Sequence, residues 1–168
     1  VQGVYTHTSD LCQCDMTFGL FLPEDAEHGP VPVLWFLSGL TCTHENAMVK
    51  SGAQRWAAEA GIAMVFPDTS PRGDKVADDP DYDLGQGAGF YIDAVAIPWA
   101  AHYQMWSYVT QELPSALFNA YPLAEAAQSY VTTYAGLASV MIALVFLYTI
   151  ASVFIYGGEF NAELKRYR

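Results

Sequence analysis

Three residues that follow an apolar run have the types and the position that acyl-transfer chemistry needs. Ser38, Gly39 and Leu40 come directly after residues 33–37, whose sequence is VLWFL. Glycine allows a sharp turn, so that a backbone N–H group can face a substrate. An N–H group that is already oriented toward a developing oxyanion stabilises the transition state of acyl transfer. The pattern therefore suggests one half of an oxyanion hole, although Ser-Gly also occurs in many other strand–helix loops.

A glycine-rich segment further along the chain resembles a phosphate loop only in part. Gly85, Gly87 and Gly89 form G-x-G-x-G rather than G-x-G-x-x-G. They also follow the aspartates of residues 78–83, which would repel a phosphate group. These aspartates could bind a hard cation, but a solvated loop is the more usual role of such a run. Nucleotide binding is therefore not expected.

Two further patterns are incomplete as metal sites. His44 and Glu45 begin the zinc-protease motif H-E-x-x-H, but Met48 stands where the second histidine belongs. Cys12 and Cys14 have no second Cys/His pair at zinc spacing. We therefore expect no metal and no cofactor.

The elements around the Ser-Gly-Leu turn follow a strand–helix–strand order. Residues 33–37 are continuously apolar, which is typical of a strand buried on both faces. A helical pattern covers residues 45–60, with a break near Ser51, and Gly61 would end it. Residues 62–66 form a second apolar run of strand length. This order predicts a βαβ unit with parallel strands.

The flanking segments complete the predicted domain. Residues 15–23 have the composition of a strand, and the Gly-Pro within residues 24–32 predicts a turn. Residues 69–98 predict a long polar loop, a feature that is usually functional in a compact domain. Residues 101–120 predict a helix, which Pro114 must kink or restart.

Charge is distributed unevenly along the chain. The formal net charge of −11 comes entirely from residues 1–124, which hold 15 acidic and 4 basic residues. Such an acidic chain is a poor candidate for binding nucleic acid. A hydrophobic content of 52% also excludes intrinsic disorder. Residues 126–158 carry no charge at all, which explains why charged residues make up only 15% of the chain.

The uncharged segment includes a candidate membrane span. Residues 135–156 are almost wholly apolar, and as a helix they would extend about 33 Å, enough to cross a bilayer core of about 30 Å. Lys165, Arg166 and Arg168 follow, which by the positive-inside rule places the C-terminus in the cytoplasm. The alternative is a deeply buried helix of a soluble protein.

Several sequence runs together resemble the S-formylglutathione hydrolase family, also called esterase D. The resemblance covers about residues 3–129, and its main runs are VPVLWFLSGLTCTHENAMVKS ending at Ser51, PDTSPRG at 67–73, GAGFYIDA at 87–94 and MWSY at 105–108. It implies an α/β fold: the N-terminal half of an α/β-hydrolase, with a mixed, mostly parallel sheet and flanking helices.

The resemblance also implies a function. Members of this family are cytosolic serine hydrolases that convert S-formylglutathione and water to glutathione and formate, a step of formaldehyde detoxification. They use a Ser–His–Asp triad and an acyl-enzyme intermediate. By position, the Leu40 N–H would be an oxyanion-hole donor, and Gly39 and Cys42 would lie near the active site. The implied partner is a small thioester substrate, and no cofactor is involved.

One departure from the family is large. Its Gly-His-Ser-Met-Gly-Gly motif should follow soon after Ser129, but residues 130–134 lead into the apolar segment, and no G-x-S-x-G occurs in the 168 residues. The nucleophile, the rest of the triad and the second oxyanion donor are therefore missing. We expect a truncated hydrolase domain at 1–129 that is inactive alone, followed by an apolar helix with a basic end at 130–168.

The tail has a looser resemblance of its own. About 35 residues, including GGEFNAEL at 157–164, resemble the last membrane helix of the YihY/BrkB inner-membrane family. This favours an alternative in which the chain joins two unrelated genes near residue 129. It would then be a non-catalytic, membrane-anchored fusion protein or an artefact of a gene junction. The hydrolase-like part would be cytoplasmic, anchored to the inner membrane by residues 135–156.

Overall fold

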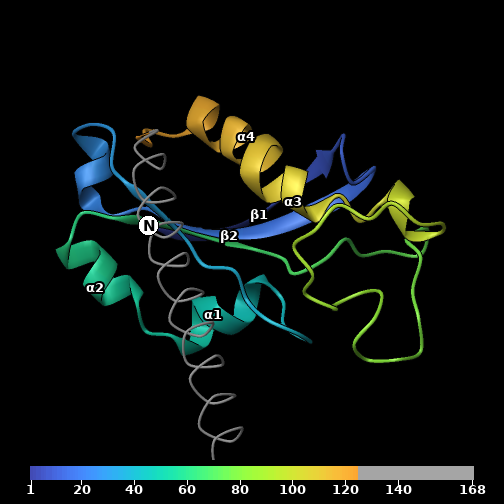
Figure 1. Cartoon of the computed structure of the whole chain (residues 1–168). Coiled ribbons are helices and arrows are strands. Elements are labelled where there is room, and N and C mark those ends of the chain that lie inside the picture. Colours follow the sequence, from blue (N-terminus) through green and yellow to red (C-terminus); the bar gives the residue numbers. More distant parts are fainter. Residues whose placement is uncertain (125–168) are drawn as a thin grey trace, which may run out of the picture. The chain divides into compact units, whose positions relative to one another are not determined.

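An antiparallel hairpin opens the computed structural model, which describes residues 1–124 (Figure 1). Strand β1 (Gln2–Ser9) pairs with strand β2 (Cys14–Phe21) along its whole length. Strand β2 lies where the sequence predicted a strand at residues 15–23. A short 3₁₀ helix, η1 (Glu24–Glu27), follows in the segment predicted to turn.

The predicted βαβ unit comes next and is confirmed. It consists of β3 (Val33–Trp35), α1 (His44–Lys50), α2 (Gln54–Glu59) and β4 (Ala63–Pro67). Strands β3 and β4 are parallel. The two helices are separated near Ser51, where the sequence predicted a break.

A capping box fixes the start of α1. The Thr43 side chain accepts a hydrogen bond from the Glu45 N–H, and the Asn46 side chain accepts one from the Thr43 N–H at 2.8 Å. Such reciprocal bonds satisfy backbone donors that the first turn of a helix leaves unpaired. The loop between β3 and α1 therefore ends at a fixed point.

The sheet is mixed, with strand order β1-β2-β4-β3 in the described residues. Strand β2 runs antiparallel to both of its neighbours, and only the β3–β4 pair is parallel. The expectation of a mostly parallel sheet was therefore wrong for this part of the chain. The reason is that β2 returns from the hairpin and pairs directly with β4, while the single crossover supplies one parallel pair.

Strand β3 lies at the edge of the four-stranded sheet, and it is not buried on both faces as predicted. Leu34 is 48% exposed and Leu37 is 45% exposed. Residues 122–124 extend the sheet only at the start of this edge, where Val31 and Leu123 form a parallel bridge. The continuous apolar run correctly indicated a strand, but within residues 1–124 the strand has a full-length neighbour on one side only.

The segment predicted as one helix at 101–120 is divided. After η2 (Trp99–Ala101) come α3 (Met105–Ser107), a π-helical turn η3 (Tyr108–Glu112) and α4 (Leu113–Ala120). Proline cannot donate a hydrogen bond within a helix, so Pro114 fits best in a first turn. It occupies that place in α4, directly after the π-helical turn, which fits the predicted kink or restart at this residue.

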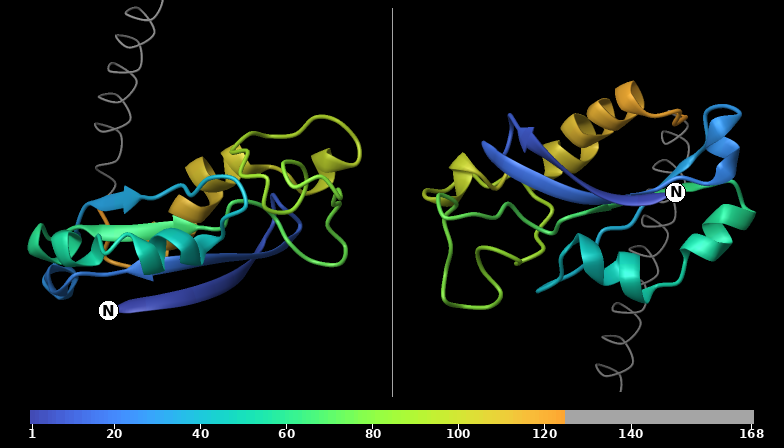
Figure 2. Two further views of the ribbon diagram at one scale, coloured as in Figure 1. Left: turned by 90° about the horizontal axis from the view of Figure 1, so that it is seen from below. Right: turned by 180° about the vertical axis from the view of Figure 1, so that it is seen from behind.

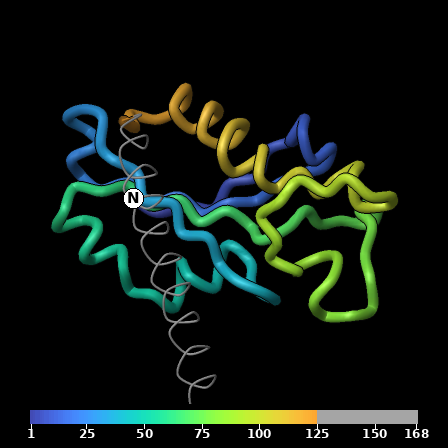
Figure 3. Tube along the Cα trace, in the orientation of Figure 1, coloured from blue at the N-terminus to red at the C-terminus, as the bar shows by residue number. Residues whose placement is uncertain are grey.

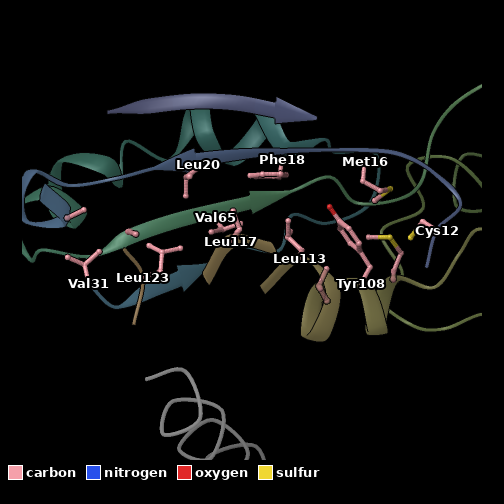
Figure 4. Packing of buried hydrophobic residues seen from close by; sticks show 14 residues of the cluster. Cys12, Met16, Phe18, Leu20, Val31, Val65, Tyr108, Leu113, Leu117 and Leu123 are labelled. Atoms are coloured by element: carbon pink, nitrogen blue, oxygen red, sulfur yellow. The ribbon is translucent and has the colours of Figure 1, made fainter. Parts of the chain in front are cut away.

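Helices cover both faces of the sheet, which gives three layers (Figure 2). Successive strand residues point to opposite faces. In β4, Val65 packs toward α4, in the cluster that includes Leu113, Leu117 and Tyr108 (Figure 4). Met64 and Phe66 pack on the other face, with residues of α1 and α2. All five residues of β4 are buried, so β4 is the centre of the core.

Two expectations fall outside the described residues. The apolar helix at 135–156 lies beyond residue 124, as does the whole segment 130–168 assigned to a second domain. Within residues 1–124, no helix has the length and apolarity that crossing a membrane requires.

Candidate functional site

The loop from β3 to α1 carries all three residues that the sequence assigned to a site: Leu40, Gly39 and Cys42. It leaves the sheet after the Phe36 N–H donates to the Val65 carbonyl at 2.9 Å. Figure 3 shows that it approaches the long loop between β4 and α3 at one end of the sheet. The structure therefore places the candidate residues beyond the carboxyl ends of the parallel strands, where ligands bind in open α/β sheets.

A tight turn orients the Gly39–Leu40 peptide. The Cys42 N–H donates to the Gly39 carbonyl at 3.2 Å, and Thr41 has a left-handed φ of 63°. In a trans peptide the C=O and the following N–H point in opposite directions. The Leu40 N–H therefore points away from the turn, and within residues 1–124 no acceptor forms a hydrogen bond with it. Leu40 itself is 41% exposed.

The glycine-rich segment of the long loop packs against this turn. The Thr41 N–H donates to the Gly87 carbonyl at 2.8 Å, and the Gly87 N–H donates to the Ser70 hydroxyl at 2.6 Å. The Tyr91 hydroxyl donates to the Ser38 carbonyl at 2.8 Å. Burial raises the pKa of Tyr91, so its hydroxyl stays protonated and remains a donor at neutral pH.

Gly89 explains part of the G-x-G-x-G pattern. A Cβ atom at this position would lie 3.0 Å from both the Leu40 nitrogen and the Gly39 carbonyl carbon. Its φ of 72° is also a conformation that L-residues rarely adopt. Gly89 therefore lets one loop approach the backbone of another.

A partly buried ion pair contacts the same turn. Arg72 Nε lies 3.1 Å from both Asp68 carboxylate oxygens, and Arg72 Nη2 donates to the Cys42 carbonyl at 3.0 Å. The Thr69 hydroxyl donates to the same carbonyl. His44 Nδ1 lies 3.7 Å from an Asp68 oxygen. The carbonyl of Cys42 is thus held by two donors from the segment that follows β4.

No role for Asp68 or Arg72 was predicted from the sequence. The run PDTSPRG at 67–73 did contain a sign that these residues matter, because its charged residues follow closely after a strand whose residues are all buried. A charge at such a position needs a partner. The spacing of residues in the sequence could not show that Arg72 also donates a hydrogen bond to the carbonyl of Cys42, which lies 30 residues earlier in the chain.

Comparison with known proteins assigns the family. Residues 9–153 match the family model Esterase, described as "Putative esterase". The chain belongs to this esterase family. The match continues past residue 129, where the sequence predicted a junction, and the comparisons give no support to the resemblance between the tail and the YihY/BrkB family.

Relatives of this chain include two bacterial S-formylglutathione hydrolases. The protein from Paracoccus denitrificans (strain Pd 1222) is 66% identical over 128 residues, which are 76% of this chain and 46% of the relative. The solved structure from Agrobacterium tumefaciens is 49% identical with a TM-score of 0.72, covering 73% of this chain and 45% of that one. The chain therefore spans less than half the length of these relatives.

A more distant solved structure shows the fold alone. The S-formylglutathione hydrolase FrmB from Staphylococcus aureus is 17% identical, with a TM-score of 0.53 over 74% of this chain and 43% of that one. The predicted α/β-hydrolase-like fold, with its mixed sheet, is therefore confirmed for the described residues.

Proposed function

We propose that residues 1–124 are the oxyanion-donor part of a serine thioesterase that resembles S-formylglutathione hydrolase. The observation that carries this proposal is the Leu40 N–H, which lies beyond the carboxyl end of β3 without an acceptor in the described residues. Its turn is fixed by hydrogen bonds at Thr41 and Cys42. The 66% identity to the Paracoccus hydrolase supports S-formylglutathione as the substrate.

The proposed reaction adds water to S-formylglutathione and releases glutathione and formate. When a nucleophile attacks the thioester carbonyl, negative charge develops on the carbonyl oxygen. A backbone donor that is already oriented stabilises this charge without further rearrangement, and the loss of one such donor lowers kcat by about 10²–10³-fold. Leu40 would supply one donor, and the hydrogen bond from the Cys42 N–H to the Gly39 carbonyl would hold the turn.

The chain alone is proposed to be inactive, because no G-x-S-x-G occurs in its 168 residues. In serine hydrolases the loss of triad members lowers the rate by about 10⁴–10⁶-fold. We expect the purified chain to hydrolyse S-formylglutathione and p-nitrophenyl acetate no faster than a heat-treated sample. Clear turnover by the chain alone would contradict this.

A chimera tests the positive part of the proposal. The 128 residues of this chain that match the Paracoccus denitrificans hydrolase would replace the corresponding part of that enzyme, whose remaining part would supply the nucleophile. The proposal predicts hydrolysis of S-formylglutathione within about tenfold of the parent enzyme, because the replaced segments are 66% identical. A folded chimera without activity would count against the proposal.

A second candidate is a non-catalytic, membrane-anchored protein whose hydrolase-like part is cytoplasmic. It is favoured by a single observation, the 33 uncharged residues between Glu125 and Glu159. These residues lie outside the described part of the chain. Carbonate extraction of membranes tests this candidate, because an anchored chain stays in the pellet and a peripheral or soluble chain moves to the supernatant.

A further inference from the structure

An apolar cavity of about 140 Å³, partly open to solvent, lies within the long loop that precedes α3. Its wall includes Leu84, Ala88, Phe90, Ile92, Trp99 and Tyr103. The rings of Trp99 and Tyr103 meet edge to face, with centroids 5.3 Å apart. The function proposed above does not use this cavity.

The two hydroxyl groups in the cavity wall already have partners. The Ser70 hydroxyl accepts a hydrogen bond from the Gly87 N–H at 2.6 Å, and the Tyr103 hydroxyl donates to the Ala77 carbonyl. A polar ligand would lose hydrogen bonds to water and find few replacements here, which costs free energy. The wall therefore favours an apolar occupant.

The size of the cavity indicates the size of that occupant. In another protein, an apolar cavity of about 150 Å³ stays free of water and binds benzene or xenon. A cavity of about 140 Å³ therefore has room for a ring of about six carbon atoms, and the exposed side chains of Phe90 and Ile92 leave it partly open to solvent. Aromatic side chains such as Trp99 and Phe90 would contact the faces and edges of such a ring.

The cavity also borders the candidate oxyanion turn. Gly89 is part of its wall, and the same residue packs against the Gly39–Leu40 peptide. We propose that this cavity is a binding site for a small apolar ring or alkyl group of about six carbon atoms, located beside the Leu40 peptide. The site is formed by residues 70–103 and does not depend on the proposed thioesterase activity.

Titration of the isotopically labelled 168-residue chain with benzene tests the proposal. The expected result is saturable shifts of the NMR signals of the Gly85 and Gly89 amides, which belong to wall residues. The Gly3 and Gly19 amides in the β1–β2 hairpin should not move. Unsaturable shifts, or equal shifts at all four glycines, would overturn the proposal.

A filling variant with a matched control makes the test specific. Ala88→Leu adds three carbon atoms inside the cavity and should raise the dissociation constant of benzene at least about tenfold. Ala58→Leu makes the same change at an exposed position of α2 and should leave binding unchanged. A folded Ala88→Leu variant that binds like the parent would contradict the proposal.

A third variant keeps the test decisive if Ala88→Leu does not fold. The Ile92 side chain lines the cavity but is 62% exposed, so Ile92→Ala should leave the fold intact. It removes contacts on one side of the ligand, and we expect the dissociation constant of benzene to rise several-fold. An unchanged dissociation constant would overturn the proposal.

Loss of benzene binding in any variant leaves the thioesterase proposal intact, because that proposal is judged by the activity of the chimera.

Discussion

The guanidinium of Arg72 donates to the carbonyl oxygen of Cys42 at 3.0 Å, and so joins the segment after β4 to the loop that holds Leu40. The same side chain is fixed by the buried carboxylate of Asp68. The loop after one parallel strand thereby supports the loop after its neighbour. A residue outside the predicted site thus sets the position of residues within it.

Removal of this support should destabilise the fold. We expect Arg72→Ala to lower the free energy of unfolding by about 1–3 kcal/mol, because Asp68 remains buried without its charged donor. This range lies below that of a fully buried pair, because the Arg72 side chain is 36% exposed. Urea denaturation monitored by circular dichroism measures the change.

The chain offers a matched control for this substitution. Arg55 and Glu59 form an ion pair with the same four-residue spacing, but both side chains are exposed. Arg55→Ala should change the free energy of unfolding by no more than about 0.5 kcal/mol. Equal effects of the two substitutions would refute a special role for Arg72.

Close approach of two loops should make Gly89 intolerant of a side chain. Gly89→Ala would place a Cβ atom 3.0 Å from the backbone at Leu40, at a φ that already disfavours alanine. We expect a loss of about 1–3 kcal/mol of stability. Gly39→Ala is the matched control, because a Cβ there meets no atom within 4 Å and φ is not in the left-handed range. If both variants unfold at the same urea concentration, the packing described here is wrong.

Burial of the Cys12 thiol should make stability fall at high pH. Burial raises the pKa of Cys12 from 9.0 to about 11. Between these values the unfolded chain loses the proton first, so the unfolded state is favoured as pH rises. The expected loss is up to about 2–3 kcal/mol across that range. Burial also raises the pKa of Tyr103, to about 12, so this tyrosine adds a decline of the same sign above pH 10.

A variant without the thiol separates the two contributions. Cys12→Ala should reduce the decline of unfolding free energy between pH 9 and about 10 and leave the smaller decline that comes from Cys14, whose pKa burial also raises. The comparison uses the slope with pH, so it is independent of any stability lost by the substitution itself. An unchanged slope in Cys12→Ala would show that another group causes the decline.

The sequence predicted local structure well where a single physical cause dominates. Gly61 was expected to end a helix and the apolar run at 62–66 to form a buried strand; α2 does end just before Gly61, and every residue of β4, which begins at Ala63, is buried. Prediction from the sequence failed where the pairing of strands in the folded sheet decides the structure. The apolar run at 33–37 could not show that Leu34 would lie in an edge strand, and nothing in residues 15–23 showed that β2 would pair antiparallel with β4.

Of the candidate site, only the backbone donor at Leu40 could be predicted from the sequence. Leu40 could be proposed because a strand, a glycine and a helix follow one another within a short segment. The support from Arg72 and the packing of Gly89 depend on loops that meet only after folding. Such contacts between distant segments have no local signature.

The central claim is that the Leu40 N–H donates to the oxyanion, and two variants of the chimera with the Paracoccus hydrolase test it most directly. Leu40→Pro removes this donor, whereas Leu40→Ala retains it and shortens a side chain that is 41% exposed. We predict that kcat for S-formylglutathione falls by about 10²–10³-fold in Leu40→Pro and by less than about fivefold in Leu40→Ala. A folded Leu40→Pro chimera with the activity of Leu40→Ala would contradict the account.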